Sequence, residues 1–183
     1  MLSSFDIFEI DFKNRSMKRI LILVAILMIS SCSPKLFKEK WTEEKAPVTF
    51  KARFETTQGN FEIEAKREWS PKGVDRLYQL IKNEFYTDVA IFRVVPNFVA
   101  QFGIHNDSIV NKGWNGVGVE DEPVVISNTK GTVTSGMENV LKFYDKHGNK
   151  LGMKQDSIGK FGNKFLREKY PEIDYIIKAY ILK

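Results

Sequence analysis

The sequence predicts a mainly β domain with flanking helices, and three stretches support this fold class. Residues 91–102 contain two apolar runs on either side of a turn signal, as in a β-hairpin. Residues 48–67 have the same organisation, with turn residues at their centre. Apolar residues recur with helical spacing over residues 74–81, which predicts a helix between the two hairpins.

The second hairpin contains the most informative residues. Pro96 and Asn97 suit the centre of a tight turn, so that strands are expected over 88–95 and 98–102. A period of two places Val99 and Gln101 on one face and Phe98, Ala100 and Phe102 on the other. Arg93 lies among apolar neighbours, so it either extends past the edge of the core or points into a shallow apolar pocket. Composition alone favours the first interpretation.

The other elements follow from local signals. In the first hairpin, residues 48–56 and 61–67 flank a turn at 57–60. Ser70 is expected to cap a helix that begins with Pro71, and the apolar face of this helix packs on the sheet. Residues 104–122 predict a loop in which Trp114 is a hydrophobic cover rather than a lid. Further along the chain we expect a short edge strand at 123–126, helices at 137–144 and 161–169, and a closing strand at 175–182.

Length and charge set limits on function. The chain of 183 residues fits one domain plus a targeting segment, and its net charge of +5 is spread without a basic block. This charge supports solubility or weak attraction to acidic surfaces, and we expect no nucleic-acid partner. His105 and His147 are isolated, with ordinary surface or loop roles, so neither a metal site nor a cofactor is predicted.

The N-terminal region has the features of an export signal. Lys18 and Arg19 precede an apolar run at 20–29 that is too short to span a bilayer comfortably. The run ends in Ile-Ser-Ser-Cys at 29–32, which resembles the bacterial lipobox, and Cys32 is the only cysteine. A buried free cysteine is the alternative. We expect lipid on Cys32 to anchor a lipoprotein in the bacterial envelope, facing the periplasm or the exterior.

The predicted organisation has three parts. Residues 1–31 form an N-terminal extension and signal peptide, residues 32–47 a charged tether, and residues 48–183 the folded domain. Sixteen residues before the positively charged region are unusual for such a signal. Translation from Met17 is the preferred explanation, and a genuine cytoplasmic extension is the alternative.

An ordered series of motifs resembles one protein family. The block Phe92-Arg93-Val94-Val95-Pro96-x-Phe98-x-x-Gln101-x-Gly103 is similar to the signature of the cyclophilins, which are peptidyl-prolyl cis-trans isomerases. The neighbouring motifs also occur in the family's order: Thr57-Gln58-Gly59-Asn60-Phe61-Glu62-Ile63-Glu64, Asn83-Glu84-Phe85-Tyr86 and Lys130-Gly131-Thr132-Val133. The resemblance implies a cyclophilin-like antiparallel β-barrel.

One part of the family pattern has no counterpart. After Thr134 the chain continues directly into 135–140, which is similar to the start of the family's second helix. The family's strand of the type Q-F-F-I, the loop after it and a strand of the type F-G-x-V are skipped. We therefore expect a barrel that lacks two strands, with a segment missing near 134–135. The loss of two strands exposes sheet edges and part of the core.

The resemblance also assigns roles to side chains. Rotation about an X-Pro bond crosses a barrier of about 18–20 kcal/mol and needs neither a metal nor a cofactor. A catalyst stabilises the twisted amide more than the planar forms. By resemblance, Arg93 donates to the prolyl nitrogen, Gln101 holds the peptide backbone, and Phe98 and Val99 line the proline pocket. Proline-containing polypeptides are the implied partners.

These observations support competing functional hypotheses. The first is an isomerase acting on X-Pro bonds of exported proteins, with turnover weakened or lost because the skipped segment supplies the family's other pocket wall. The alternative is a non-catalytic envelope lipoprotein that binds polypeptide, for example by strand addition at an open sheet edge. An internally deleted chain without a selected function is the third.

Overall fold

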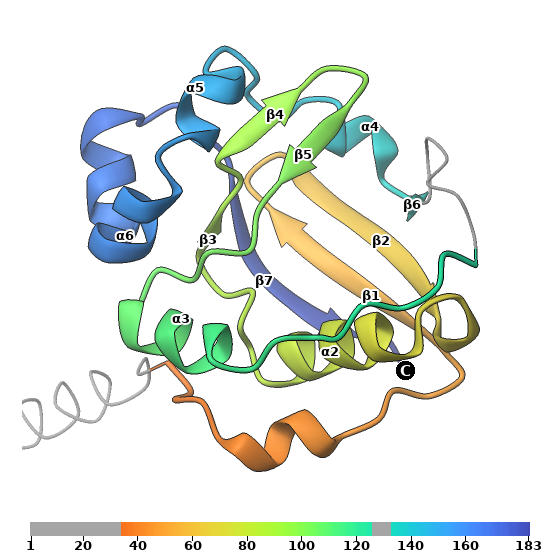
Figure 1. Cartoon of the computed structure of the whole chain (residues 1–183). Coiled ribbons are helices and arrows are strands. Elements are labelled where there is room, and N and C mark those ends of the chain that lie inside the picture. The colour runs from red at the N-terminus through yellow and green to blue at the C-terminus, as the bar shows by residue number, and fades with distance from the viewer. Residues whose placement is uncertain (1–33, 126–132) are drawn as a thin grey trace, which may run out of the picture. The chain divides into compact units, whose positions relative to one another are not determined.

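The computed structural model describes residues 34–125 and 133–183 (Figure 1). Within them, residues 35–183 belong to one compact unit. Cys32, the signal segment and the Lys130–Thr132 part of the fourth motif lie outside the described residues. None of the helices within the described ranges is long and apolar enough to cross a membrane.

Five strands form an antiparallel sheet at the centre of the domain. Their order is β3-β7-β1-β2-β6. The strands are β1 (Thr49–Thr56), β2 (Gly59–Lys66), β3 (Val89–Ala90), β6 (Val133–Ser135) and β7 (Tyr175–Ile181). The first predicted hairpin is confirmed, since β1 and β2 pair from Thr49↔Lys66 to Thr56↔Gly59. The predicted closing strand is confirmed as β7, which pairs with β1 on its other side.

The β4–β5 hairpin forms a second, separate ladder. It consists of β4 (Arg93–Val95) and β5 (Val99–Gln101), which pair only with each other among the described strands. The domain thus has antiparallel sheets and several helices, as expected for the fold class. A barrel that lacks two strands stays a prediction.

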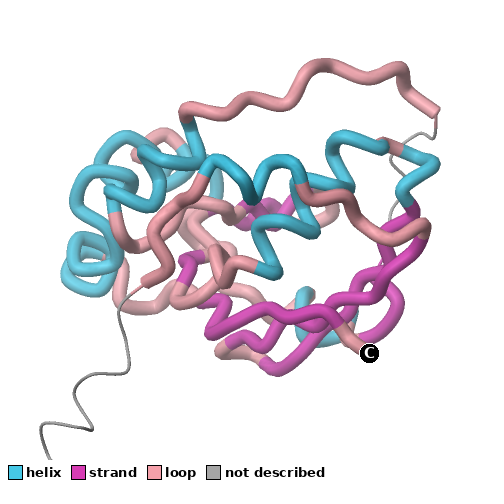
Figure 2. Tube along the Cα trace, turned by 90° about the horizontal axis from the view of Figure 1, so that it is seen from below, coloured by secondary structure: helices cyan, strands magenta, loops and turns pink. Residues whose placement is uncertain are grey.

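Side-chain alternation along β1 defines the core. Phe50, Ala52 and Phe54 are buried, whereas Lys51 and Arg53 between them are more exposed. The helix α2 (Pro71–Lys82) packs against this core through its apolar stripe, as predicted, and the rings of Phe50 and Tyr78 meet with centroids 5.4 Å apart. Figure 2 shows the strands on one side of the molecule and most of the helical chain on the other.

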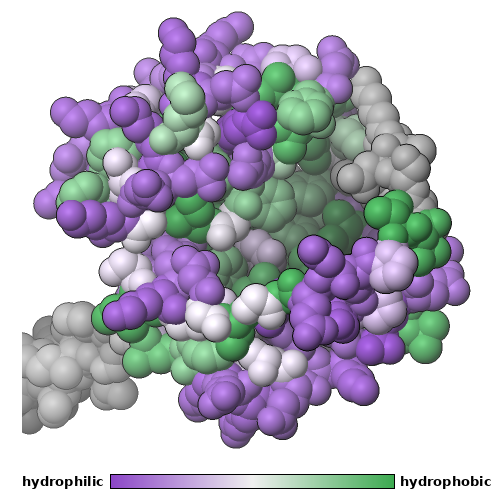
Figure 3. All heavy atoms as spheres, in the orientation of Figure 1, coloured by the Kyte–Doolittle hydropathy of each residue, from purple (hydrophilic) through white to green (hydrophobic). Residues whose placement is uncertain are grey.

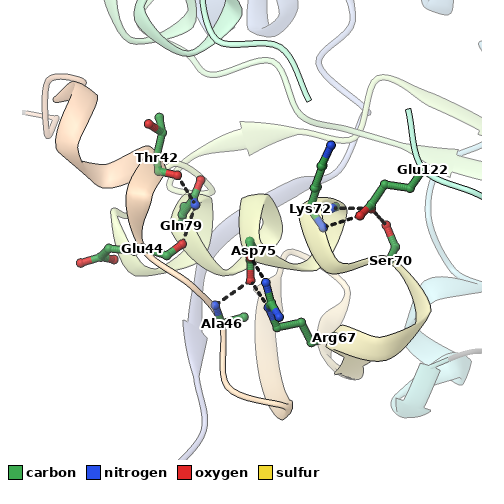
Figure 4. A network of polar contacts seen from close by, with 10 residues as sticks. Thr42, Glu44, Ala46, Arg67, Ser70, Lys72, Asp75, Gln79 and Glu122 are labelled. Atoms are coloured by element: carbon green, nitrogen blue, oxygen red, sulfur yellow. Dashed lines mark hydrogen bonds and ion pairs between the residues drawn. The ribbon is translucent and has the colours of Figure 1, made fainter. Parts of the chain in front are cut away.

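Ser70 does not cap α2, contrary to the prediction. Its side chain accepts no capping hydrogen bond and instead donates to Glu122 at 2.7 Å. The Glu122 carboxylate takes over the cap: it accepts from the Lys72 N–H at 2.8 Å and from the Gly73 N–H at 3.2 Å (Figure 4). These hydrogen bonds hold the pKa of Glu122 below its usual value; the bond from the Lys72 N–H has the largest effect, and the bond from Ser70 has the next largest. A charged acceptor at a helix N-terminus also gains from the helix dipole.

The segment before β1 packs on the domain, so the predicted tether over 32–47 is wrong in its second half. The buried Gln79 side chain donates to two backbone oxygens of this segment, Thr42 O at 3.0 Å and Glu44 O at 2.6 Å (Figure 4). Asp75 accepts from the Ala46 N–H at 2.8 Å. Residues 37–46, with the short 3-10 helix η1 (Glu39–Glu43), are called the strap below. Polar side chains of α2 thus form hydrogen bonds with backbone groups of the strap. The charge and proline content of the segment alone did not reveal these bonds.

Aromatic packing fixes the other end of the strap. Trp41 stacks on Trp114 with centroids 6.2 Å apart, and Phe37 lies 5.0 Å from Trp114. Trp114 is buried in helix α3 (Ser108–Asn115), which the sequence predicted as loop. The Asp107 side chain caps α3 by accepting from the Ile109 N–H at 2.7 Å. Trp114 thus has the structural role that was predicted, and two of its aromatic partners come from the strap.

His105 lies in the loop before α3, which agrees with the loop role among its two predicted roles, but it is buried and not at the surface. Its ring Nδ1 accepts from the Asp107 N–H at 2.9 Å, and its backbone bonds to the Asn111 side chain at 2.7 and 2.6 Å. Burial lowers the pKa of His105, so its neutral form is favoured in the fold. It orders the chain entering α3.

The C-terminal helices differ in length from the predicted ones. The helix expected at 137–144 is confined to α4 (Met137–Val140), followed by α5 (Gly148–Gly152) and α6 (Gln155–Lys169). Gly162 kinks α6 with φ 62°, where a Cβ would lie 2.3 Å from the Asn106 carbonyl oxygen. Residues 123–125 form no strand. A second apolar cluster, which includes Leu151, Ile158, Leu166, Ile173 and Tyr175, joins these helices to β7.

The hydrogen bonds that Asp75 accepts from the strap and from Arg67 predict that Asp75→Asn loses stability in a pH-dependent way. The hydrogen bond from Arg67, more than that from Ala46, lowers the pKa of Asp75. A carboxyl with a lowered folded pKa stabilises the fold above its unfolded pKa of about 4, and this stabilisation is lost as pH falls through the folded pKa. We expect Asp75→Asn to reduce the free energy of unfolding by about 1–2 kcal/mol at neutral pH. Denaturant unfolding at neutral pH and at about pH 3 should show the gap shrinking in acid.

Asp121→Asn is the matched control, since Asp121 is exposed and takes part in no hydrogen bond within the described residues. It should leave both unfolding curves unchanged. If the difference in free energy of unfolding between the wild type and Asp75→Asn is the same at both pH values, the stabilising role given to the Asp75 carboxylate is contradicted.

Candidate active site

The β4–β5 hairpin places the predicted site residues by its register. Arg93 pairs with Gln101 and Val95 with Val99, whereas Val94 pairs with Ala100. Residues directly opposite each other in an antiparallel ladder share a face. Arg93, Gln101 and Val99 are therefore on one face of the hairpin.

The turn agrees with its sequence signal. Pro96 is at its second position and Asn97, with φ 61°, at its third, and the Phe98 N–H donates to the Val95 carbonyl at 3.0 Å. This is the pattern of a type II turn, which needs a positive φ at the third position. The turn thereby fixes the register on which the site depends.

The opposite face of the hairpin packs on the core. Val94, Ala100 and Phe102 contact the main apolar cluster, and the ring of Phe102 lies 5.9 Å from Phe54 and 5.7 Å from Tyr86. Burial raises the pKa of Tyr86 to about 12, so its hydroxyl stays neutral beneath the hairpin. The alternation of Ala100 and Phe102 was predicted correctly.

Arg93 is held by two neutral side-chain oxygens. Its Nη1 donates to Gln101 Oε1 at 3.1 Å, and its Nε donates to Asn149 Oδ1 at 2.7 Å. None of the salt bridges among the described residues involves Arg93. A guanidinium has five N–H donors, so donors remain for a ligand while the cation keeps its full charge.

Asn149 is a site residue that the sequence analysis missed. It belongs to α5, which packs against β4 beside the hairpin (Figure 1). Gly152 of the same helix lies so close that a Cβ there would be 2.7 Å from Arg93 Cδ. The Gly and Asn of this segment were visible in the sequence, but they are about sixty residues from Arg93, and no local pattern links them.

Phe98 lies beside the guanidinium rather than in the core. The centre of its ring is 5.6 Å from Arg93 Cζ, a cation–π contact, and its side chain is 75% exposed. The alternation that grouped Phe98 with Ala100 and Phe102 was wrong at this residue, because the turn interrupts the strand. The Arg93 guanidinium thus contacts both Gln101 and Phe98. Val99 lies on the same face of the hairpin as Arg93 and Gln101.

The surface near the hairpin is hollowed and apolar. Figure 3 shows hydrophobic residues at the bottom of a hollow between the hairpin and α2, with hydrophilic residues around it. Apolar residues of both elements pack only partly buried against the core, including Val94, Phe102, Leu77 and Tyr78. The hairpin thus carries a fixed cation and an amide acceptor on one face, and its other face borders the apolar hollow; both features suit an extended polypeptide.

Two pockets lie elsewhere and share no residue with the hairpin. The larger, of about 640 Å³, is bordered by Trp69, the start of α2 and residues 119–125. The smaller is bordered by the strap, α2 and residues 118–120. Among the described residues, no three or more His, Cys, Asp or Glu side chains are grouped as a metal site.

A family comparison agrees with these observations. The family model described as "Cyclophilin type peptidyl-prolyl cis-trans isomerase/CLD" matches residues 51–149. The match includes the whole hairpin and ends at Asn149, the residue that holds the guanidinium.

Close packing at Gly152 predicts that Gly152→Ala displaces Arg93. The added methyl group meets Cδ in the middle of the side chain, so the guanidinium has to leave Asn149 or Gln101. In NMR spectra we expect the Arg93 Nε–Hε signal to shift and its proton to exchange faster with water.

Gly159→Ala is the matched control, because a Cβ at Gly159 would meet only Ile104 at an ordinary 4.0 Å. It should leave the Arg93 signal in place. An unchanged signal in Gly152→Ala would show that the guanidinium does not depend on this contact.

Proposed function

Since the chain belongs to the cyclophilin-type peptidyl-prolyl cis-trans isomerase family, we propose that it binds X-Pro segments of exported polypeptides at the β4–β5 hairpin and isomerises them slowly. The observation that carries this proposal is the pairing of Arg93 with Gln101 beside Phe98. These side chains match the roles that the family resemblance gives to an X-Pro site.

In the proposed mechanism, Phe98 and Val99 contact the proline ring and Gln101 holds the adjoining backbone. As the amide twists, the lone pair of the prolyl nitrogen is no longer delocalised into the carbonyl, so the nitrogen accepts a hydrogen bond from Arg93. This bond is stronger in the twisted state than in either planar state, so it lowers the barrier. The step needs no proton transfer.

Slow turnover follows from the exposure of the site to solvent. Phe98 is 75% exposed, so solvent reaches the ring beside the guanidinium. In water the Coulomb energy of a charge contact falls several-fold relative to a protein interior. A pocket without its second wall binds proline weakly, which agrees with the skipped segment near 134–135.

A second candidate function is polypeptide binding without turnover. The apolar hollow next to the hairpin favours it, because such a surface binds an extended chain regardless of catalysis. In this case Arg93 contributes only to binding.

Arg93→Ala separates the two functions. For an isomerase, we expect the catalysed rate of a proline-containing peptide to fall at least tenfold, because one donor aimed at the transition state is lost. Peptide binding should weaken much less. Stopped-flow or exchange NMR measures the rate, and fluorescence anisotropy measures binding.

Arg53→Ala is a suitable control, since Arg53 pairs with Glu62 on the sheet and not at the hairpin. Peptide binding by the wild-type chain without acceleration would exclude the isomerase and favour the second function.

We also propose that lipid on Cys32 holds the protein in the bacterial envelope. Support comes from the positively charged region, the apolar run and the Ile-Ser-Ser-Cys sequence that precede the domain. Several acyl chains together give stable anchoring, whereas one gives only reversible binding.

Cys32→Ala should therefore move the protein from the membrane fraction to the soluble fraction of a bacterial host, with the mass of the attached lipid lost. Immunoblots of fractionated cells and intact mass spectrometry measure this. Equal membrane content of wild type and variant would contradict the lipid anchor.

A further inference from the structure

The net charge of the chain lies in one part of the fold. Residues 142–169, which include α5 and α6, hold eight Lys and Arg against three Asp and Glu, so they account for the whole charge of +5. The rest of the chain holds 20 of each sign. The expectation of evenly spread charge is therefore wrong. We call residues 142–169 the basic lobe.

The basic lobe adjoins the hairpin. Its helix α5 packs against β4, Gly152 touches the Arg93 side chain, and Asn149 accepts its hydrogen bond (Figure 1). Lys150 directly follows Asn149, and Lys154 is two residues beyond Gly152. The two lysines are four residues apart: Lys150 belongs to α5, and Lys154 lies in the turn between α5 and α6.

These lysines have no acidic partner in the described part of the chain. Lys150 and Lys154 are exposed and take part in no ion pair there, and Lys160 and Lys164 of α6 are similar. Other basic residues of the lobe are engaged: Arg167 pairs with Asp88 at 2.7 Å, and Lys146 lies 3.8 Å from Asp145. The ammonium groups of Lys150 and Lys154 therefore produce a positive field beside Arg93.

We propose that Lys150 and Lys154 form an electrostatic subsite that favours polypeptides with Asp or Glu near the bound proline. This inference rests on the proposed function, since it assigns a substrate class to the same hairpin. A chain that contacts Arg93 passes α5, because α5 holds that side chain. An anionic membrane is the other ligand for a basic lobe, but membrane docking does not require its lysines to adjoin the proline site.

The expected gain in affinity for acidic peptides is limited because Lys150 and Lys154 are exposed to solvent. Exposed ion pairs are worth about 0.2–1 kcal/mol each, or up to about a fivefold change in affinity. Two lysines facing several carboxylates should therefore give an affinity gain of about three- to tenfold. At about 0.5 M salt most of this gain should vanish, because the Debye length falls to a few ångströms.

The test compares three labelled peptides with the same central Ala-Pro bond and flanks of Glu, Gln or Lys, titrated against the full chain by fluorescence anisotropy. We expect the Glu peptide to bind tightest. Lys150→Glu/Lys154→Glu should remove or reverse this order without changing affinity for the Gln peptide by more than about twofold.

Lys40→Glu/Lys112→Glu is the matched control. It changes the net charge equally at exposed lysines of the strap and α3, outside the basic lobe. It should keep the preference for the Glu peptide, and circular dichroism should confirm that both variants are folded. Equal loss in both variants would mean that bulk charge alone sets the preference, which overturns the proposal.

Two further outcomes also overturn it. One is an unchanged order of peptides in Lys150→Glu/Lys154→Glu. The other is loss of co-sedimentation with vesicles containing phosphatidylglycerol while the order of peptides stays unchanged, which would assign the lobe to lipid. The proposed function is judged separately, by whether the Gln peptide binds and whether Arg93→Ala slows its isomerisation.

Discussion

Phe54 of the main apolar core contacts the aromatic rings of three other segments. Its side chain is 1% exposed, and its ring stacks on Phe61 with centroids 5.0 Å apart. It also meets Tyr86 at 5.6 Å and Phe102 at 5.9 Å. One residue of β1 thus joins the sheet, the turn after α2 and the hairpin that holds the candidate site. Aromatic contacts of this kind add to the free energy gained by burial, so the hairpin stays on the sheet although no other strand within residues 34–125 and 133–183 pairs with it.

The site itself is less deeply fixed than the core. The two strands of the hairpin set the spacing of Arg93 and Gln101, but the direction of the guanidinium depends on Asn149 and the close approach of Gly152. Both belong to a five-residue helix. The chemistry therefore depends on a short element, whereas the position of the hairpin depends on the core. Such a division allows the site to lose precision while the fold persists.

Sequence patterns predicted the elements that depend on local signals. The turn at Pro96 and Asn97, the first hairpin and the apolar face of α2 all have residues with matching local preferences, and all are present. The motif around Arg93 also identified the family. Three of the failures share a cause, since each involves a partner distant in sequence. Glu122 caps α2 in place of Ser70, Asn149 orients Arg93, and the side chain of Gln79 binds the strap. Long-range polar contacts leave no periodicity that a reading of one sequence can detect.

The strap also determines where a mechanical load on the N-terminus would be felt. It enters the fold directly before β1, a strand with neighbours on both sides. Without the strap, tension would peel β1 away from its neighbours one hydrogen bond at a time. The bonds from Gln79 and Asp75 and the stacking of Trp41 on Trp114 transfer that force to α2 and α3 instead. The strap thus protects the central strand β1 and the hairpin packed on it when the chain is pulled from its N-terminal end.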